Sequence, residues 1–418
     1  MWVPLLRAVA TISVAVFATV AAAGITRSPS ASHATQPAGG SAPRTYAMGW
    51  APTPPVLTTA SRIATIQAIS YVSEYALLQE EVPWAALLAG GSISAELDNK
   101  QPVVDYLRSL GMKIVWLVDP LDGLDRTKEP PDLVAAGHSL LEPSILATHE
   151  AWVRAVAQRF HPEYFGLASE INTLAAQGSP VLYNTIVSMV NTLTPDIHAL
   201  DPGSQVFVSF QMEVAWRNDG FPLIANFNVD ALGLSSYPSF AFAHPADIPD
   251  IYYQRFAQAT SLPLLQVEGG WSSVSSAWGS GSPTDQALYY ARVGALLDGV
   301  HAKLWLGIVY ADLNLADPSW NLPPDRQAML QNFASQGITT SDFTPKPAYA
   351  AWQLLFDRPL AAPASVGGVA EVPDTASLRN GRSVARLGDR AVELMVVAAV
   401  ILVVVGAAWL LVRKQQAT

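Results

Sequence analysis

The amino-acid sequence predicts a (β/α)8 TIM barrel of the α/β class, and three observations support this prediction. Short apolar segments alternate with longer amphipathic ones from residue 46 to residue 360. Such alternation favours parallel strands joined through βαβ units, and eight short segments can be counted. Polar side chains follow several of them, and barrel enzymes carry their sites at the carboxyl ends of strands. An open doubly wound sheet is the alternative, although no GxGxxG or P-loop pattern follows the first strand.

The predicted strands are short apolar runs, and the predicted helices place apolar residues on one face. We expect strands near residues 46–50, 75–79, 112–118, 164–169, 205–210, 229–235, 263–268 and 302–310. We expect helices over residues 61–73, 101–110, 145–159, 181–193, 251–259, 284–298 and 348–356. Residues 46–360 are therefore predicted to form one catalytic barrel.

The amino-terminal segment, residues 1–24, has the pattern of an export signal. Arg7 precedes an apolar run from Ala8, which ends in three alanines before Gly24. This pattern predicts a cleaved signal peptide, with an uncleaved signal anchor as the alternative. Residues 25–45 are rich in Ser, Pro and Ala and lack the apolar content to fold, so we expect a linker.

The carboxy-terminal segment predicts a membrane anchor. Residues 361–390 resemble a second linker, and residues 391–413 form the predicted transmembrane helix. Its uncharged stretch, Leu394 to Val412, is long enough to cross a bilayer core of about 30 Å. Arg413 and Lys414 follow and favour a cytoplasmic tail over residues 414–418. We therefore expect a cell-membrane protein with one carboxy-terminal span and an extracytoplasmic barrel.

The composition of the chain argues against several classes of function. The chain has 418 residues, a formal net charge of -10 and no cysteine. The acidic balance argues against a nucleic-acid partner, because no basic stripe is present. The absence of cysteine excludes disulfides and thiol chemistry. The seven histidines form no metal-binding pattern, so we expect neither a metal nor a cofactor.

Two glutamates follow predicted strands. Residues 263–271 form an apolar strand that ends in Glu268, Gly269, Gly270 and Trp271. Residues 164–172 have the same form and contain Glu170. Two carboxyl groups about 5–5.5 Å apart are what a retaining glycosidase needs, one as acid and one as nucleophile. The sequence therefore predicts a two-carboxylate site.

These segments resemble the clan A glycoside hydrolases, a superfamily of (β/α)8 retaining enzymes. Val267-Glu268-Gly269-Gly270-Trp271 resembles the nucleophile segment, particularly that of the arabinogalactan endo-β-1,4-galactanase family. Residues 230–238 resemble the strand-six segment of that family, and Ala168-Ser169-Glu170-Ile171-Asn172 occupies the acid/base place. The resemblance implies that Glu268 is the nucleophile and Glu170 the acid/base. The clan usually has Asn before the acid/base Glu, where this chain has Ser169.

The candidate substrate-binding residues are polar or aromatic side chains at predicted strand ends. In the clan, a residue placed like Tyr237 often hydrogen-bonds the nucleophile. The full set is Trp50, Glu81, Trp84, Asp119, Ser169, Asn172, Gln211, Tyr237, Trp271 and Tyr310. For the tryptophans the alternative is a place in the core, for Tyr237 packing at the barrel rim, for Glu81 a solvated loop, and for Asp119 a turn cap.

The sequence thus predicts a membrane-anchored retaining glycoside hydrolase that cleaves a β-linked glycan. Two alternatives remain open. One is a barrel that binds carbohydrate without turnover, and the other is a cell-envelope scaffold.

Overall fold

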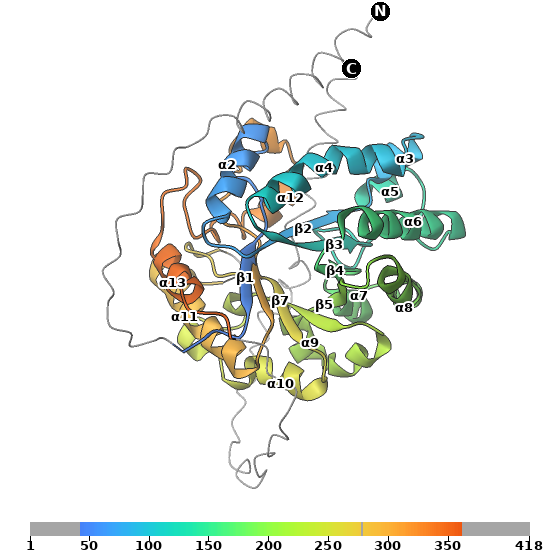
Figure 1. The fold of residues 1–418 in the computed structure, drawn as a ribbon. Helices are drawn as coiled ribbons and strands as arrows, with labels where there is room; N and C mark the ends of the chain where they lie inside the picture. The colour runs from blue at the N-terminus through green and yellow to red at the C-terminus, as the bar shows by residue number, and fades with distance from the viewer. Residues whose placement is uncertain (1–41, 277–278, 362–418) are drawn as a thin grey trace, which may run out of the picture. The chain divides into compact units, whose positions relative to one another are not determined.

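The computed structural model describes residues 42–276 and 279–361, and its centre is a closed barrel of eight parallel strands. Each strand pairs with the next in the chain, and the last pairs with the first (Figure 1). The strands are β1 (Ala47–Trp50), β2 (Tyr75–Glu81), β3 (Lys113–Asp119), β4 (Tyr164–Gly166), β5 (Gln205–Gln211), β6 (Ala231–Ser236), β7 (Leu264–Gly269) and β8 (Leu304–Gly307). The predicted barrel is confirmed, and the open-sheet alternative is wrong.

Long helices surround the barrel (Figure 1). They are α2 (Thr59–Ile69), α4 (Ile93–Ser109), α6 (Pro143–Phe160), α8 (Pro180–Leu200), α10 (Ile251–Ala259), α11 (Pro283–Gly299) and α13 (Pro347–Phe356). Each predicted helix is present. Two are longer than predicted, because α4 and α8 continue through Pro102 and Pro195.

Short helices occupy the connections that follow the strands, and the sequence did not predict them. They are α3 (Trp84–Leu88), α5 (Pro131–Ala135), α7 (Ile171–Gln177), α9 (Met212–Asn218) and α12 (Pro324–Leu330). The 3-10 helices are η1 (Phe221–Asn226), η2 (Pro238–Phe240), η3 (Pro245–Asp247) and η4 (Pro318–Trp320). Segments this short show too few turns to reveal a helical period.

The strands separate two apolar layers, because their side chains point alternately to opposite faces. Leu77, Leu117, Phe207 and Leu265 belong to the layer inside the barrel. The layer between strands and helices is larger; it includes Trp50, Trp152, Trp305 and Trp352. Which layer receives a residue decides whether its side chain can reach a ligand at the barrel mouth.

The two ends of the described barrel lie together. Arg44 forms a parallel bridge with Leu360, and its guanidinium pairs with both carboxylate oxygens of Glu74 at 2.8 and 3.0 Å. Within residues 42–276 and 279–361, no helix has the length and apolar content to span a membrane. The predicted signal segment 1–24 and transmembrane helix 391–413 lie outside the described residues.

Candidate active site

Glu268 reaches the barrel mouth because β7 contains a bulge. The pairing of β6 with β7 skips one residue, Val267. Just before the bulge, Gln266 faces the helix layer, where it bonds tyrosines of α10 and α11. In a regular strand Glu268 would face the helices as well, since residues two apart share a face. The bulge turns the Glu268 side chain toward the mouth instead.

Tyr237 holds the Glu268 carboxylate in place. The Tyr237 hydroxyl donates a hydrogen bond of 2.6 Å to Oε1 of Glu268. The ring is fully buried and stacks on Phe240, with centroids 5.3 Å apart. The contact expected between Tyr237 and the carboxylate at the end of β7 is therefore present.

Glu170 lies just beyond β4 in an unusual backbone conformation. Its φ is 47°, in the left-handed region that non-glycine residues seldom adopt. Its backbone N–H donates to the Ser209 hydroxyl at 2.9 Å. The carboxyl group is buried, and neither oxygen makes a hydrogen bond of normal geometry with the described residues. The Ser235 hydroxyl nevertheless lies close enough to lower the Glu170 pKa. Backbone outliers of this kind concentrate at functional sites.

The two glutamates have different electrostatic surroundings. Burial raises the pKa of Glu170 well above its usual range, and the neighbouring Glu268 raises it further. Burial also raises the pKa of Glu268, while the Arg126 charge and the Tyr237 hydrogen bond lower it. Glu170 is therefore the group that keeps its proton as pH rises, and Glu268 is the group that ionises first.

Arg126 is a site residue that the sequence analysis missed. It lies in the connection between β3 and α5, with 1% of its surface exposed. It forms an ion pair with Asp119, and its charge acts on both Glu170 and Glu268. Its Nε and Nη2 groups are buried without a hydrogen-bond partner among the described residues. No pattern marks an arginine in a connection as buried.

Glu213, at the start of α9, is a second residue that the sequence did not reveal. Its Oε1 accepts the backbone N–H of Tyr237 at 2.9 Å and also the hydroxyl of Tyr252. Its Oε2 accepts the side-chain amide of Gln211 at 2.6 Å. Through these bonds Glu213 positions Tyr237, which in turn holds Glu268.

Ser169, Asn172 and Gln211 bond to the protein itself. The Asn172 side chain exchanges two hydrogen bonds with the backbone of Gln211, at 2.9 and 2.8 Å. The Gln211 side chain caps α9 by accepting the N–H of Val214. The Ser169 hydroxyl lies 3.3 Å from that of Ser209. All three predicted substrate-binding residues therefore have structural partners beside the site.

Two further predicted residues, Asp119 and Glu81, lie at the ends of neighbouring strands. Asp119 accepts the N–H of Leu121 at 3.1 Å, as a turn cap does, in addition to pairing with Arg126. Burial raises its pKa to about 6. Glu81 accepts the N–H of Gly123 at 3.1 Å, and burial raises its pKa to about 8.

Four of the predicted sugar contacts have side chains in the layer between strands and helices, the alternative that the sequence analysis gave for tryptophans. Each is at most 4% exposed, and these residues are Trp50, Trp84, Trp271 and Tyr310. Trp50 packs on Trp352 at 4.6 Å between ring centroids and on Tyr310 at 5.7 Å. Aromatic residues filling a core have no free face for a sugar.

The described residues contain no group of three or more His, Asp or Glu side chains placed to hold a metal ion. The groups that lie together at the barrel mouth are two carboxyl groups of unequal acidity, a phenol and a guanidinium.

Comparison with solved structures finds glycoside hydrolases with the same barrel. The Ignisphaera aggregans GH53 catalytic domain superposes with a TM-score of 0.50 at 12% identity, covering 71% of this chain and 88% of that one. A GH5_18 variant from Streptomyces cattleya, in complex with Manβ1-4GlcNAc, gives 0.56 at 15% identity, covering 75% and 80%.

A third structure, the exo-β-1,4-mannosidase Op5Man5 from Opitutaceae bacterium strain TAV5, gives a TM-score of 0.57 at 14% identity. That match covers 77% of this chain and 62% of the mannosidase. No protein-family model and no curated protein sequence matches this chain. At these identities the likeness shows a shared barrel fold.

Proposed function

We propose that this protein is a retaining glycoside hydrolase that cleaves β-glycosidic bonds in a poly- or oligosaccharide. The observation that carries the proposal is the pair of buried carboxyl groups, one just beyond β4 and one near the end of β7, with the Glu170 pKa raised further by Glu268. A two-step displacement requires this division between a protonated and an ionised carboxyl group.

In the first step, Glu170 donates its proton to the glycosidic oxygen while Glu268 attacks the anomeric carbon. The glycosyl group becomes covalently bound to Glu268, and the leaving sugar departs with the proton. In the second step Glu170, now a carboxylate, takes a proton from water, which attacks the same carbon and frees Glu268. The Tyr237 hydroxyl and the Arg126 charge both favour the ionised form of Glu268 before each turnover.

Two of the structural neighbours act on or bind β-linked sugars, which supports the β-linked substrate class. One of these is an exo-β-1,4-mannosidase, and another binds Manβ1-4GlcNAc. The resemblance of residues 267–271 to the galactanase nucleophile segment supports the same class.

The proposal includes a membrane location. The uncharged residues 394–412 followed by Arg413 and Lys414 support a single carboxy-terminal span. In this arrangement the barrel faces away from the cytoplasm, where extracellular or envelope glycans are accessible. Protease treatment of intact cells and of inverted vesicles tests the location, because only the intact cells should lose the barrel.

The activity is tested by incubating the full chain with β-linked galactans, glucans, mannans and xylans and measuring new reducing ends. Glu268→Gln keeps the size of the side chain and removes the nucleophile, so it serves as the paired variant. Release of product by the parent chain and not by this variant is the expected result.

One observation favours a second candidate, a carbohydrate-binding barrel without turnover. Ser169 stands where the clan usually carries Asn, and its hydroxyl lies beside Ser209. This candidate predicts saturable glycan binding that Glu268→Gln leaves unchanged, with no product from either protein. The cell-envelope scaffold predicts neither binding nor cleavage.

A further inference from the structure

The catalytic glutamates of the proposed function are sealed from solvent. Glu170 is 0% exposed and Glu268 is 1% exposed. A glycan must bring its anomeric carbon into contact with Glu268 and its glycosidic oxygen to Glu170. No sugar ring can do so while protein covers both carboxyl groups.

Two segments far apart in the chain lie at the barrel mouth beside these carboxyl groups. One is the β3 loop, defined as residues 120–130, which buries Leu124 and Arg126 at the barrel mouth. The other is the α12 segment, defined as residues 318–336, which lies between β8 and α13. Phe333 of the α12 segment packs edge-on against Tyr237, with ring centroids 5.3 Å apart.

A single bidentate ion pair joins the α12 segment to the β3 loop. The Arg326 guanidinium donates to both carboxylate oxygens of Asp122, at 3.1 and 3.0 Å. The Asp122 side chain is 7% exposed and that of Arg326 is 22% exposed. Planar two-point pairing of this kind is strong and directional, and partial burial protects it from screening by salt.

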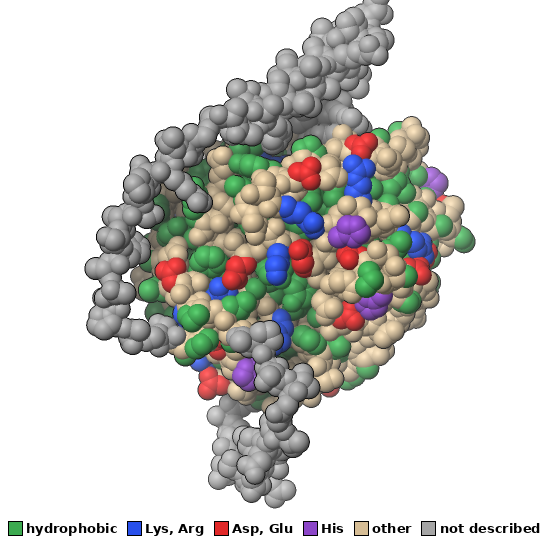
Figure 2. Space-filling model, in the orientation of Figure 1, with side chains coloured by type: hydrophobic (Ala, Val, Ile, Leu, Met, Phe, Trp, Pro, Cys, Tyr) green, Lys and Arg blue, Asp and Glu red, His purple; other side chains and the backbone are tan. Residues whose placement is uncertain are grey.

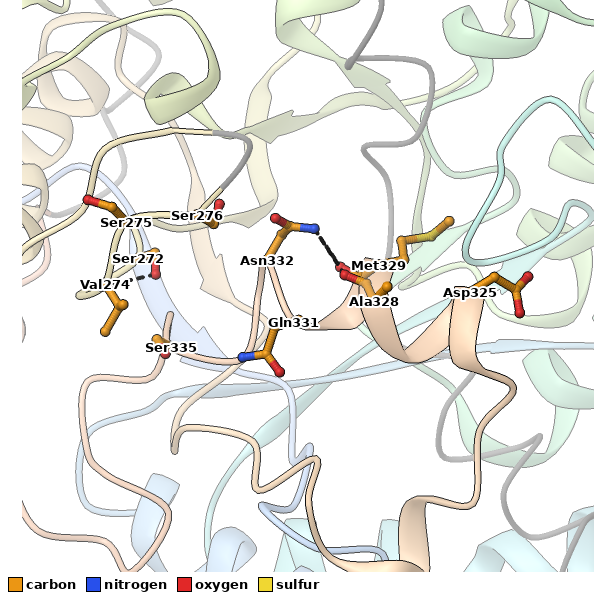
Figure 3. A pocket seen from close by; sticks show the side chains of 10 residues that line it. All are labelled: Ser272, Val274, Ser275, Ser276, Asp325, Ala328, Met329, Gln331, Asn332 and Ser335. Atoms are coloured by element: carbon orange, nitrogen blue, oxygen red, sulfur yellow. Dashed lines mark hydrogen bonds between the residues drawn. The ribbon is translucent and has the colours of Figure 1, made fainter.

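One face of the α12 segment is not packed. A groove of about 580 Å³ runs between this segment and the connection that follows β7. Figure 3 shows Asp325, Ala328 and Met329 on the side of the helix, with Ser272 and Val274 on the opposite side. The segment therefore has space beside it into which it can move.

The covered site also leaves polar atoms unsatisfied. The Nε and Nη2 groups of Arg126 are buried without a hydrogen-bond partner among the described residues. Unpaired buried polar groups destabilise the state that contains them. Among the described residues, the Asp122–Arg326 pair is the ion pair that joins the two segments.

We propose that the β3 loop and the α12 segment form a two-part lid, closed in this structure, which the Asp122–Arg326 pair latches and which must open for a glycan to reach Glu170 and Glu268. This inference rests on the proposed function for its purpose. The opening itself is a physical property that can be measured without substrate.

The chain has no cysteine, so one engineered thiol reports on the mouth. Ser235→Cys is nearly isosteric, lies beside Glu170 and leaves both glutamates in place. The rate at which a small methanethiosulfonate reagent modifies this thiol in the full chain measures how often the lid opens. Arg326→Gln, which removes the charge of the latch, should raise the rate about tenfold or more.

Arg255→Gln is the matched control, because Arg255 pairs with Asp219 at 2.8 Å on a part of the barrel outside the lid. It should leave the modification rate unchanged. Modification of the Ser235→Cys thiol at the rate of a free thiol in the parent background would overturn the lid, and so would equal rates with and without Arg326→Gln.

A second experiment locks the lid. In the Asp122→Cys/Arg326→Cys double variant, a short bis-maleimide with a reducible linker joins the two segments. The joined protein should lose glycan cleavage and recover it on reduction, whereas equal cleavage in both forms would contradict the lid. If no form cleaves any glycan, the proposed function fails, and the thiol modification rates still decide whether the lid exists.

Discussion

At the residue scale, the site depends on unequal surroundings for two chemically identical side chains. Neither carboxyl oxygen of Glu170 accepts a hydrogen bond of normal geometry from the described residues, whereas Glu268 accepts the Tyr237 hydroxyl at 2.6 Å. Arg126 favours the ionised form of both. The Tyr237 hydrogen bond, which lowers the Glu268 pKa, and the Glu268 charge, which raises the Glu170 pKa, therefore separate the two pKa values.

Removing the Tyr237 hydroxyl tests this account. Tyr237→Phe should lower kcat about 10- to 100-fold, because a hydrogen bond to a charged group is lost. That bond lowers the Glu268 pKa, so its loss should raise it. The acidic limb of the bell-shaped kcat/KM profile, which reports ionisation of Glu268, should then move to higher pH.

Tyr253→Phe provides the control for that variant. Tyr253 is also fully buried, but its hydroxyl bonds Gln266 in the helix layer rather than Glu268. This variant should keep the parent pH profile even if it loses stability. Equal displacement of the acidic limb in both variants would show that Tyr237 has no special link to Glu268.

At the element scale, the bulge in β7 is the feature that directs a glutamate to the barrel mouth. The strand ends in Gly269, whose φ of 154° L side chains rarely adopt. A Cβ atom at this position would lie 2.5 Å from the backbone oxygen of Ser236 on β6. The end of β7 therefore requires glycine both for its backbone conformation and for its close contact with the neighbouring strand.

Gly269→Ala should destabilise the barrel by about 2–3 kcal/mol and reduce activity further, because it displaces the residue next to Glu268. Denaturant unfolding gives the first quantity and kcat the second. Gly299→Ala is the control, since a Cβ atom there meets nothing within 4 Å. It should change stability by no more than about 0.5 kcal/mol. Similar losses in the two variants would exclude a special requirement at Gly269.

At the scale of the whole molecule, acidic side chains occur both on the visible surface and buried at the barrel mouth. Figure 2 shows acidic and basic side chains interspersed over the face that it displays. The barrel mouth instead collects buried carboxyl groups. Burial raises the pKa of Asp119 to about 6 and that of Glu81 to about 8.

These raised values predict how stability changes with pH. A carboxyl group whose pKa is higher in the folded state binds more protons there than in the unfolded chain. Its contribution is complete below the unfolded pKa of about 4.3 and is lost as pH rises through the folded value. Glu81 should therefore reduce stability progressively between about pH 4 and pH 8.

Thermal unfolding between pH 5 and pH 9 measures this effect. Glu81→Gln should flatten the fall in Tm over this window, because Glu81 has a higher pKa in the folded state than Asp119. Asp105→Asn, at an exposed position on α4, should leave the slope as it is in the parent. A parent Tm that rises from pH 5 to pH 8 would contradict the prediction.

The fold was largely predictable because its signals are local. Each of the eight strands is a short apolar run, and each long helix has its own apolar face, so neither needs a distant residue to be recognised. Glu170 and Glu268 were found for the same reason. A carboxylate directly after an apolar strand is easily recognised in the sequence, because burying such a group at the end of a strand does not stabilise the fold.

The environment of each side chain was less predictable, because the direction in which a side chain points from its strand depends on tertiary contacts. Trp50 and Trp271 follow or end strands as ligand-binding residues do, yet both pack against the helix layer. Glu268 faces the mouth only because Val267 interrupts the pairing with β6, and no local pattern signals that bulge. In a regular strand, the face to which each side chain points can be counted from the sequence. A bulge residue reverses this alternation for the residues that follow it.

The sequence alone determined the barrel, the order of its elements and the positions of two carboxyl groups at one rim, because these follow from local hydrophobic period and parallel topology. The tertiary structure decided what surrounds those groups. Arg126 and Glu213 come from the connections between strands and long helices, and only folding brings them to Glu268 and to the Tyr237 that holds it. Electrostatic effects act through space, so the residues that set the acidity of a site need not lie near it in the chain.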